Sequence, residues 1–547
     1  MAVHTGAGSS PLAMNRRHFV AGVGGLIACR ALGAMEVNSA VKGAVLAPPR
    51  IVGPIPVSGN SVPYATSLEP GSHTAMLMQE FDYVEEEYFL FGYANVYGPA
   101  PRDASPAAAD GSGLDIMRLK PLSVIVEPAM PYATRVLMAR PRANSNFSGR
   151  VHAYTFHNLN ATVAVERNLL RKGDAVLGLE GCSGTRFGPL EEPSGGIAQL
   201  HKANLQRYRD LRFADASPLA WPGLKPGALA QAFRHLDFGS VNAASDVFVQ
   251  ELYRSYAQAP DVITQLAQAL KSGNPALPFE GKVKKLFSFG ASGGSTILQR
   301  YIDVHHNSGM LPDGRPPFDG YFIMVGMLPE TRPTGAVLVY LESEAEAISG
   351  VHTHKEIPPD TDTPAFRFYQ IPGTGHMISA PLPEVSAVRA GTEMRPAAAV
   401  VPKGIVGLSD TGEVPAGLSR MDKVNQPIVW GIWNDMYQLI EQGMSLPKAP
   451  RIRLDANAPD GIARDQHGNA LGGLRTPWVE VPDATYLARI SQKDPLRAGM
   501  RPFGDEEMKK LYGSRRHYIQ LVNRKVDQLV HDRWIMAEDA DLMKLKS

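Results

Sequence analysis

One stretch near the middle of the chain constrains its fold more than any other. An apolar run over residues 286–289 is followed directly by Gly290-Ala291-Ser292-Gly293-Gly294. After these small residues, apolar side chains recur at helical spacing through residues 297–302. The pattern predicts a strand, a tight turn and a helix, with Ser292 on the turn as a candidate nucleophile. Because glycine and serine are common, the motif alone also fits a glycine-rich turn without chemistry.

The overall composition narrows the class of protein. A chain of 547 residues is too long to fold around one ordinary hydrophobic core. Its content of 44% hydrophobic and 20% charged residues is typical of globular proteins. Lysine and arginine number 55 against 54 aspartate and glutamate, so a nucleic-acid partner is not expected. Cys29 and Cys182 are the only cysteines, which excludes a disulfide framework, and no apolar run reaches membrane-spanning length.

Residues 1–44 are predicted to be a leader and not part of the fold. Asn15-Arg16-Arg17-His18-Phe19 precedes a mild apolar stretch, as in twin-arginine export signals. The expected location is therefore periplasmic or secreted. Two less favoured alternatives stay open. Residues 26–29 resemble a lipoprotein box, which would place a lipid anchor on Cys29, and the segment also fits a cytoplasmic tail.

Strand and helix patterns alternate along the rest of the chain. Residues 45–149 predict a β-rich N-terminal region that pairs with the edge of the main sheet. Residues 150–400 predict a mostly parallel sheet with helices on both faces. Together with the motif at Ser292, this pattern indicates the α/β class and the α/β-hydrolase fold. The strand candidates are residues 83–94, 132–141, 151–156, 175–179, 286–289, 321–325, 337–341 and 366–371.

Two segments are additional to a minimal fold of this kind. The polar insertion at about residues 183–246 lies where a lid often covers a hydrolase site, although a surface excursion fits equally. Residues 401–547 form a C-terminal extension that we expect to pack on the core, with an amphipathic helix over residues 518–530. Arg475 in this extension could be a substrate contact or a structural anchor, and the structural role is favoured.

A serine nucleophile needs a histidine that takes its proton and a carboxylate that orients the imidazole. The strand at 366–371 runs into a glycine-lined loop that ends at His376, the candidate base. The strand at 337–341 runs into Glu342-Ser343-Glu344-Ala345-Glu346. Glu346 is slightly favoured as the acid because of its distance from the strand end, and Glu344 stays open as the alternative.

The oxyanion of an acyl-transfer reaction needs N–H donors around it. Gly293, the residue after the nucleophile, is expected to supply one of them. The second is expected from the loop after the strand at 151–156, where Asn158 is the candidate, although asparagine is also an ordinary turn residue. Separately, His305 and His306, beyond the helix that follows Ser292, are expected to face solvent.

Several segments occur in the same order as in a known family. They are residues 83–94, 132–135, 140–141, 147–149, 205–208, 246–248, 290–294, 343–346, 373–376 and 468–478. On these segments the chain resembles the bacterial "alpha/beta hydrolase domain" family of large exported hydrolases, over about residues 80–540. The resemblance implies a serine hydrolase with its catalytic residues at the positions named above.

The chain departs from the family pattern at two places. The family usually has Gly-x-Ser-Gln-Ser where Gly293-Gly294 follow Ser292 here, which removes a side chain beside the nucleophile. The family's Ser/Thr-Glu-Thr-Asp becomes Ser343-Glu344-Ala345-Glu346. This change lengthens one candidate acid and leaves the other as it is.

The function expected from these residues is that of a carboxylic-ester hydrolase working through an acyl-enzyme. Ser292 would attack the carbonyl, His376 would move the proton, and Glu346 or Glu344 would orient the imidazole. Such chemistry needs neither a metal nor an organic cofactor, and the expected partner is a small-molecule ester substrate. The alternative is a non-catalytic binding or scaffold protein with the same fold.

Overall fold

The computed structural model describes residues 46–64, 73–99, 122–156, 167–180, 196–214, 257–291, 293–326, 328–349, 362–376, 378–379, 414–491 and 497–546. The candidates Ser292 and Asn158 lie outside these residues, as do the predicted leader and Cys29. Within the described ranges, no helix combines the length and the apolar character needed to cross a membrane.

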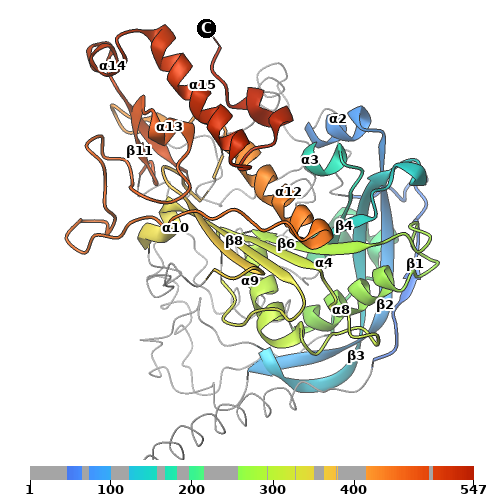
Figure 1. The fold of residues 1–547 in the computed structure, drawn as a ribbon. Helices are drawn as coiled ribbons and strands as arrows, with labels where there is room; N and C mark the ends of the chain where they lie inside the picture. Colours follow the sequence, from blue (N-terminus) through green and yellow to red (C-terminus); the bar gives the residue numbers. More distant parts are fainter. Residues whose placement is uncertain are drawn as a thin grey trace, which may run out of the picture.

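A large sheet forms the centre of the molecule (Figure 1). In the described part of the chain it has nine strands in the order β1-β2-β3-β5-β4-β6-β7-β8-β9. Strands β5, β4, β6, β7, β8 and β9 pair in parallel, whereas β1, β2 and β3 add an antiparallel edge next to β5. The bounds are β1 (Arg50–Val52), β2 (Tyr83–Pro99), β3 (Leu122–Pro141), β4 (Arg150–Phe156), β5 (Ala175–Glu180), β6 (Lys285–Ala291), β7 (Gly320–Met324), β8 (Val337–Ser343) and β9 (Phe366–Ile371).

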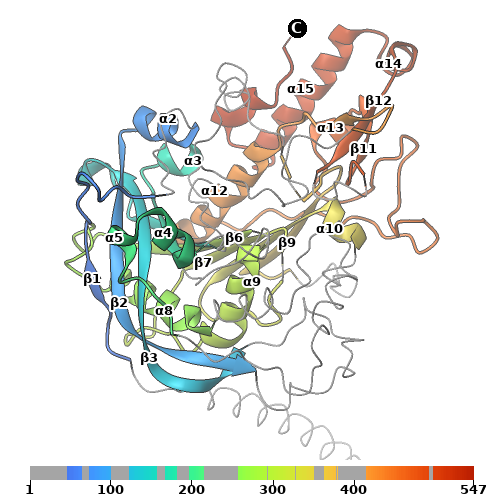
Figure 2. The ribbon, with the colours of Figure 1, turned by 180° about the vertical axis from the view of Figure 1, so that it is seen from behind.

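Helices cover both faces of this sheet, as Figures 1 and 2 show from opposite sides. Strands β5, β8 and β9 are therefore buried along their whole length. Neighbouring residues of β6 divide between the two faces because side chains alternate along a strand. Leu286 belongs to the cluster that includes Leu298, and Phe287 belongs to the cluster that includes Trp433. The mostly parallel sheet with helices on both faces is thus confirmed.

The helices on the two faces come from different parts of the chain. One face carries α8 (Ala259–Lys271) and α9 (Gly293–Arg300), and the other carries α12 (Gln426–Gln442) and α15 (Arg515–His531). Helix α12 has a proline in its first turn and ends at Gly443 in the left-handed conformation, at φ 72°. The shorter helices are α2 (His73–Glu80), α3 (Arg167–Leu170), α4 (Gly196–Ala203), α5 (Leu205–Tyr208), α10 (Glu344–Ser349), α13 (Pro477–Glu480) and α14 (Asp505–Tyr512).

The described part of the predicted insertion packs against the antiparallel edge. Arg212, just beyond α5, exchanges two backbone hydrogen bonds of 2.8 Å with Ala133 of β3. Arg207 of α5 donates to the buried carboxylate of Glu87 on β2 at 2.6 Å. These contacts anchor residues 196–214 to the sheet. The lid role stays a prediction, because residues 215–250 lie outside the described part of the chain.

The C-terminal extension covers the outer edge of β9. It contains a small antiparallel sheet of β10 (Ser419–Arg420), β12 (Gly499–Pro502) and β11 (Ala484–Leu487). The Leu474 N–H donates to the Gln370 carbonyl at 2.7 Å, and the Ile452 N–H donates to the Gln370 side chain at 2.8 Å. The extension therefore supplies part of the hydrogen bonding at the outer edge of the parallel sheet.

Candidate active site

The turn that carries the candidate nucleophile connects β6 to α9. Strand β6 ends at Ala291 and helix α9 begins at Gly293, and Ser292 lies outside the described residues. A Cβ atom on Gly290 would lie 2.9 Å from the Gly294 carbonyl oxygen and 3.0 Å from the Ser295 Cα. Only glycine therefore lets the helix start this close to the strand. The strand–turn–helix arrangement predicted around Ser292 is present on both sides of it.

Gly293, the first residue of α9, holds the position expected for an oxyanion donor. The N–H groups in the first turn of a helix have no acceptor inside the helix and point toward its N-terminal end. Its role as a donor stays a prediction. The same holds for Asn158, since residues 157–166 lie outside the described part.

Glu346 lies in α10, directly after the carboxyl end of β8. Its Oε2 accepts a hydrogen bond from the Ser343 N–H at 3.2 Å and a second from the Ser343 hydroxyl. The carboxylate is buried and held by the last residue of the strand that precedes it. Its other oxygen is directed to His376.

His376 follows the neighbouring strand β9, in the loop predicted from the sequence. Its Nδ1 lies 2.6 Å from Glu346 Oε1. Because an ionised carboxylate only accepts hydrogen bonds, this contact places a proton on Nδ1 and the lone pair of the neutral ring on Nε2. A histidine held in this way can take a proton from a hydroxyl group.

Glu344, the other candidate acid, has different partners. Its Oε1 forms an ion pair of 2.7 Å with Arg464, and its Oε2 accepts the Gly373 N–H at 2.6 Å. The side chain is fully buried, and burial raises the pKa of this carboxyl although Arg464 and the Gly373 N–H oppose the shift. The structure therefore brings Glu346, and not Glu344, into hydrogen-bond contact with the His376 ring.

The C-terminal extension packs directly on the histidine loop. A Cβ atom on Gly375 would lie 2.5 Å from the Ala498 N and 3.0 Å from the Ala488 carbonyl oxygen. This loop can approach the extension only without a side chain at residue 375. Sequence patterns did not indicate this contact or the role of Arg464, because Arg464 stands in a turn-rich segment with no periodic signal.

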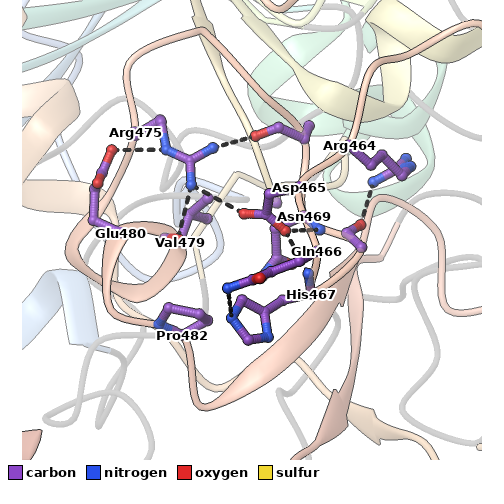
Figure 3. A network of polar contacts seen from close by, with 12 residues as sticks. Arg464, Asp465, Gln466, His467, Asn469, Arg475, Val479, Glu480 and Pro482 are labelled. Carbon is purple, nitrogen blue, oxygen red and sulfur yellow. Dashed lines mark hydrogen bonds and ion pairs between the residues drawn. The ribbon is translucent and has the colours of Figure 1, made fainter. Parts of the chain in front are cut away.

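Arg475 is held in a polar network within the same extension (Figure 3). Its guanidinium donates to Glu480 Oε1 at 2.7 Å, to the Val479 carbonyl at 3.0 Å and to the Ala470 carbonyl. A carboxylate oxygen of Asp465 lies 3.3 Å from it. These contacts are those of the structural anchor that the sequence predicted.

The expectation that His305 and His306 face solvent is wrong. Both are buried. The chain continues beyond α9 as a π-helix, η5 (Tyr301–His305), which ends at His305, and His306 follows it directly. His306 Nδ1 lies 2.7 Å from the Tyr321 hydroxyl and its Nε2 lies 2.9 Å from the Thr334 carbonyl. Both nitrogens of the His306 ring therefore have hydrogen-bond partners inside the core.

The fold and the site together define the class of the protein. A strand–turn–helix around a serine, a glutamate after the next strand but one, and a histidine after the following strand occur in the order typical of α/β hydrolases. The sequence matches the family model described as "Alpha/beta hydrolase domain" over residues 51–544. The chain belongs to this family, and the resemblance noted from its motifs is confirmed.

Solved structures with similar folds are distant in sequence. A candidate dienelactone hydrolase from Klebsiella pneumoniae is 12% identical, with 45% of this chain and 82% of that chain covered and a TM-score of 0.26. Esterase Est22 is 9% identical, with 56% and 76% covered and a TM-score of 0.26. A serine hydrolase homologue from Coxiella burnetii is 8% identical, with 45% and 84% covered and a TM-score of 0.20. The sequence matches no curated protein. The assignment to hydrolases therefore rests on the family match.

Proposed function

We propose that this hydrolase cleaves carboxylic esters through an acyl-enzyme, with Ser292, His376 and Glu346 as its catalytic residues. The observation that carries the proposal is the 2.6 Å contact between His376 Nδ1 and Glu346 Oε1. Both residues follow the carboxyl ends of neighbouring parallel strands, and β6 ends directly before Ser292 at the same edge of the sheet. This arrangement supports the proposal that three strands of one sheet carry a nucleophile, a base and an orienting carboxylate.

The proposed reaction has two steps. In the first, Ser292 attacks the ester carbonyl while His376 Nε2 takes the hydroxyl proton, and Glu346 stabilises the resulting imidazolium. The tetrahedral oxyanion is stabilised by the Gly293 N–H and by a donor from the loop containing Asn158. His376 then gives its proton to the leaving alcohol. In the second step, water attacks the acyl-enzyme by the same route and releases the carboxylic acid.

Glu346 is the proposed acid because its geometry fits the task and that of Glu344 does not. An orienting carboxylate has to accept from Nδ1 while a second group fixes its own position. Glu346 Oε1 contacts His376 Nδ1, and the hydrogen bond from Ser343 fixes the position of the Glu346 carboxylate. Both oxygens of Glu344 are directed to Arg464 and Gly373.

An ester substrate is proposed because esters require least from a site of this kind. An ester needs only the nucleophile, the base and the oxyanion donors, whereas an amide also needs strong protonation of a poor leaving group. The substrate is expected to be a small molecule. Because residues 1–44 carry a twin-arginine pattern, we further propose that the enzyme acts in the periplasm or outside the cell.

Covalent labelling of the folded protein with a fluorophosphonate tests the proposal. We expect one label per chain on the peptide that contains Ser292, no label in Ser292→Ala, and turnover of p-nitrophenyl esters by the same preparation. A folded protein that neither reacts with the fluorophosphonate nor turns over esters would contradict the proposal and favour a non-catalytic binding protein. Varying the acyl chain length of the p-nitrophenyl esters then defines the acyl-binding side of the site.

A further inference from the structure

We propose that Arg464 and Glu344 are positioning residues through which the C-terminal extension holds the two halves of the Glu346–His376 pair together. Arg464 belongs to the extension, and Glu344 is the first residue of α10, two positions before Glu346. The two side chains form an ion pair of 2.7 Å. This inference rests on the proposed function, because it concerns the residues proposed there as base and acid.

The carboxylate of Glu344 connects both elements that carry the pair. Its Oε2 accepts the N–H of Gly373, which lies three residues before His376 in the loop after β9. The backbone adds a second connection, because the Ala345 N–H donates to the Thr374 carbonyl at 3.3 Å. Helix α10 and the histidine loop are therefore joined at a point close to both catalytic side chains. A displacement of Gly373 relative to α10 would change the distance between His376 and Glu346.

Arg464 is itself fixed within the extension before it reaches Glu344. Its Nε lies 3.0 Å and its second guanidinium nitrogen 2.6 Å from Asp460 Oδ2, and it also donates to the Gly468 carbonyl at 2.9 Å. A guanidinium held in this way offers one N–H to Glu344 at little further cost in side-chain entropy.

The ion pair matters because Glu344 is fully buried. Burial disfavours an ionised carboxylate unless a counter-ion and hydrogen-bond donors compensate for the lost hydration. Arg464 supplies the counter-ion, and the Gly373 N–H supplies a hydrogen bond. Without Arg464, Glu344 would be a buried carboxylate lacking its counter-ion, and either water or a shifted loop would have to replace it. A neutral glutamine at residue 344 would need no counter-ion and would still accept the Gly373 N–H.

A positioning role of Arg464 should appear in kcat and not only in stability. Arg464→Leu should lower kcat for a p-nitrophenyl ester about 10- to 100-fold with little change in KM, because a small displacement of a catalytic group has an effect of this size. The double variant Arg464→Leu with Glu344→Gln should recover most of the lost kcat. A melting curve of each variant separates this loss of kcat from a general loss of stability.

Arg475→Leu is the matched control. Arg475 lies in the same extension and makes a similar number of polar contacts, directed to Asp465, Glu480 and two backbone carbonyls (Figure 3). Its loss should leave kcat unchanged when activity is expressed per fluorophosphonate-reactive site. If Arg464→Leu does not fold, Glu344→Ala replaces it, because this variant also removes the acceptor of the Gly373 N–H and should lower kcat in the same way.

Hydrogen exchange of the peptide containing Gly373 is a readout that does not depend on turnover. We expect faster exchange of this peptide in Arg464→Leu, exchange close to wild type in the double variant, and no change in Arg475→Leu. Wild-type kcat and exchange in Arg464→Leu, or a double variant no better than the single one, would overturn the inference. If the wild type hydrolyses no ester, the proposed function fails, and the exchange experiment still decides whether the extension holds the loop.

Discussion

Two histidine–carboxylate pairs lie at opposite ends of the parallel strands. His376 and Glu346 follow the carboxyl ends of β9 and β8, with 2.6 Å between Nδ1 and Oε1. His152 lies near the amino end of β4, with its Nε2 3.1 Å from an Asp174 oxygen just before β5. The His376 side chain is 17% exposed, whereas that of His152 is 3% exposed.

The two pairs have different surroundings. The His152 ring is enclosed by the rings of Phe287, Trp433 and Tyr437, and its Nε2 also lies 2.9 Å from the Tyr437 hydroxyl. This pair joins α12 to the sheet. The His376 pair lies on a loop and a short helix beyond the strand ends, where side chains can reach a substrate. A histidine beside a carboxylate is therefore a catalytic candidate only when its place in the fold leaves it accessible.

The largest difference between the two pairs should appear in catalysis. Glu346→Gln should lower kcat about 10³- to 10⁴-fold, because a neutral amide neither selects the right tautomer nor stabilises the imidazolium. Thermal unfolding should change little. Ester turnover and a melting curve on the same sample measure both effects. Equal, mild effects of Glu344→Gln and Glu346→Gln on kcat would mean that the acid lies elsewhere.

Asp174→Asn should lower stability and leave catalysis unchanged, the opposite of the result expected for Glu346→Gln. At pH 7 it should lower the free energy of unfolding by about 3 kcal/mol, because it breaks a buried charged network, while kcat per active site stays at the wild-type value. Burial alone would raise the pKa of Asp174. The hydrogen bond and charge of His152, together with Arg150 and Ser148, outweigh burial, so the pKa is lowered from its ordinary value. Urea unfolding measured from pH 7 down to below pH 3 tests this.

The sign of that pH dependence follows from linkage. A carboxyl whose pKa is lowered by folding stabilises the native state above its ordinary value of 3.8, and this contribution is lost as the pH falls through the folded pKa. The difference in stability between wild type and Asp174→Asn should therefore shrink in acid. A difference that stayed constant with pH would contradict the assignment of Asp174 as a charged partner.

Asp435 on α12 should show the reverse pH dependence. Burial raises the pKa of this carboxyl from 3.8 to about 7, although Arg533 opposes the shift. Its contribution to stability is thus fully present below about pH 4 and is lost as the pH rises to about 7. Asp435→Asn should raise the free energy of unfolding at pH 8 by about 1–2 kcal/mol and have little effect at pH 4. Urea unfolding at the two pH values checks this, and a variant less stable at pH 8 would contradict it.

The smallest effect is expected from Tyr437→Phe. This change removes the hydroxyl near His152 Nε2 and keeps the ring, so it should cost about 1 kcal/mol of stability. Ester turnover per active site should not change. A large loss of kcat in Tyr437→Phe would show that the buried pair is coupled to the site, which the comparison of the two pairs does not predict.

Part of the sheet could be predicted from the sequence because some of its strands contain continuous apolar runs. Residues 337–341, for example, form such a run within β8, which is buried on both sides. The helix of residues 518–530 was visible as an apolar stripe and lies within α15. The burial of His306 was not visible, because it depends on a π-helix and on partners at Tyr321 and Thr334.

Within the candidate site, the histidine–carboxylate pair could be predicted up to the choice between two glutamates. Ser292 and His376 stand in local patterns of glycine after a strand, which the sequence displays. Glu344 and Glu346 differ by two positions in one short helix, so no local pattern separates them. Their geometry differs because Arg464 reaches Glu344 and the His376 ring reaches Glu346. Contacts of this kind, 120 positions apart for the first pair, depend on the folded extension and not on sequence periodicity.

The proposed mechanism requires that Ser292, activated by the His376–Glu346 pair, becomes acylated during turnover. Rapid acid quenching during turnover of a p-nitrophenyl ester, followed by mass spectrometry of the peptides, detects such an adduct. We expect an acyl adduct on the peptide containing Ser292 in the wild type and none in Ser292→Ala. Ester turnover without an adduct on that peptide, or with an adduct at another residue, would contradict Ser292 as the nucleophile.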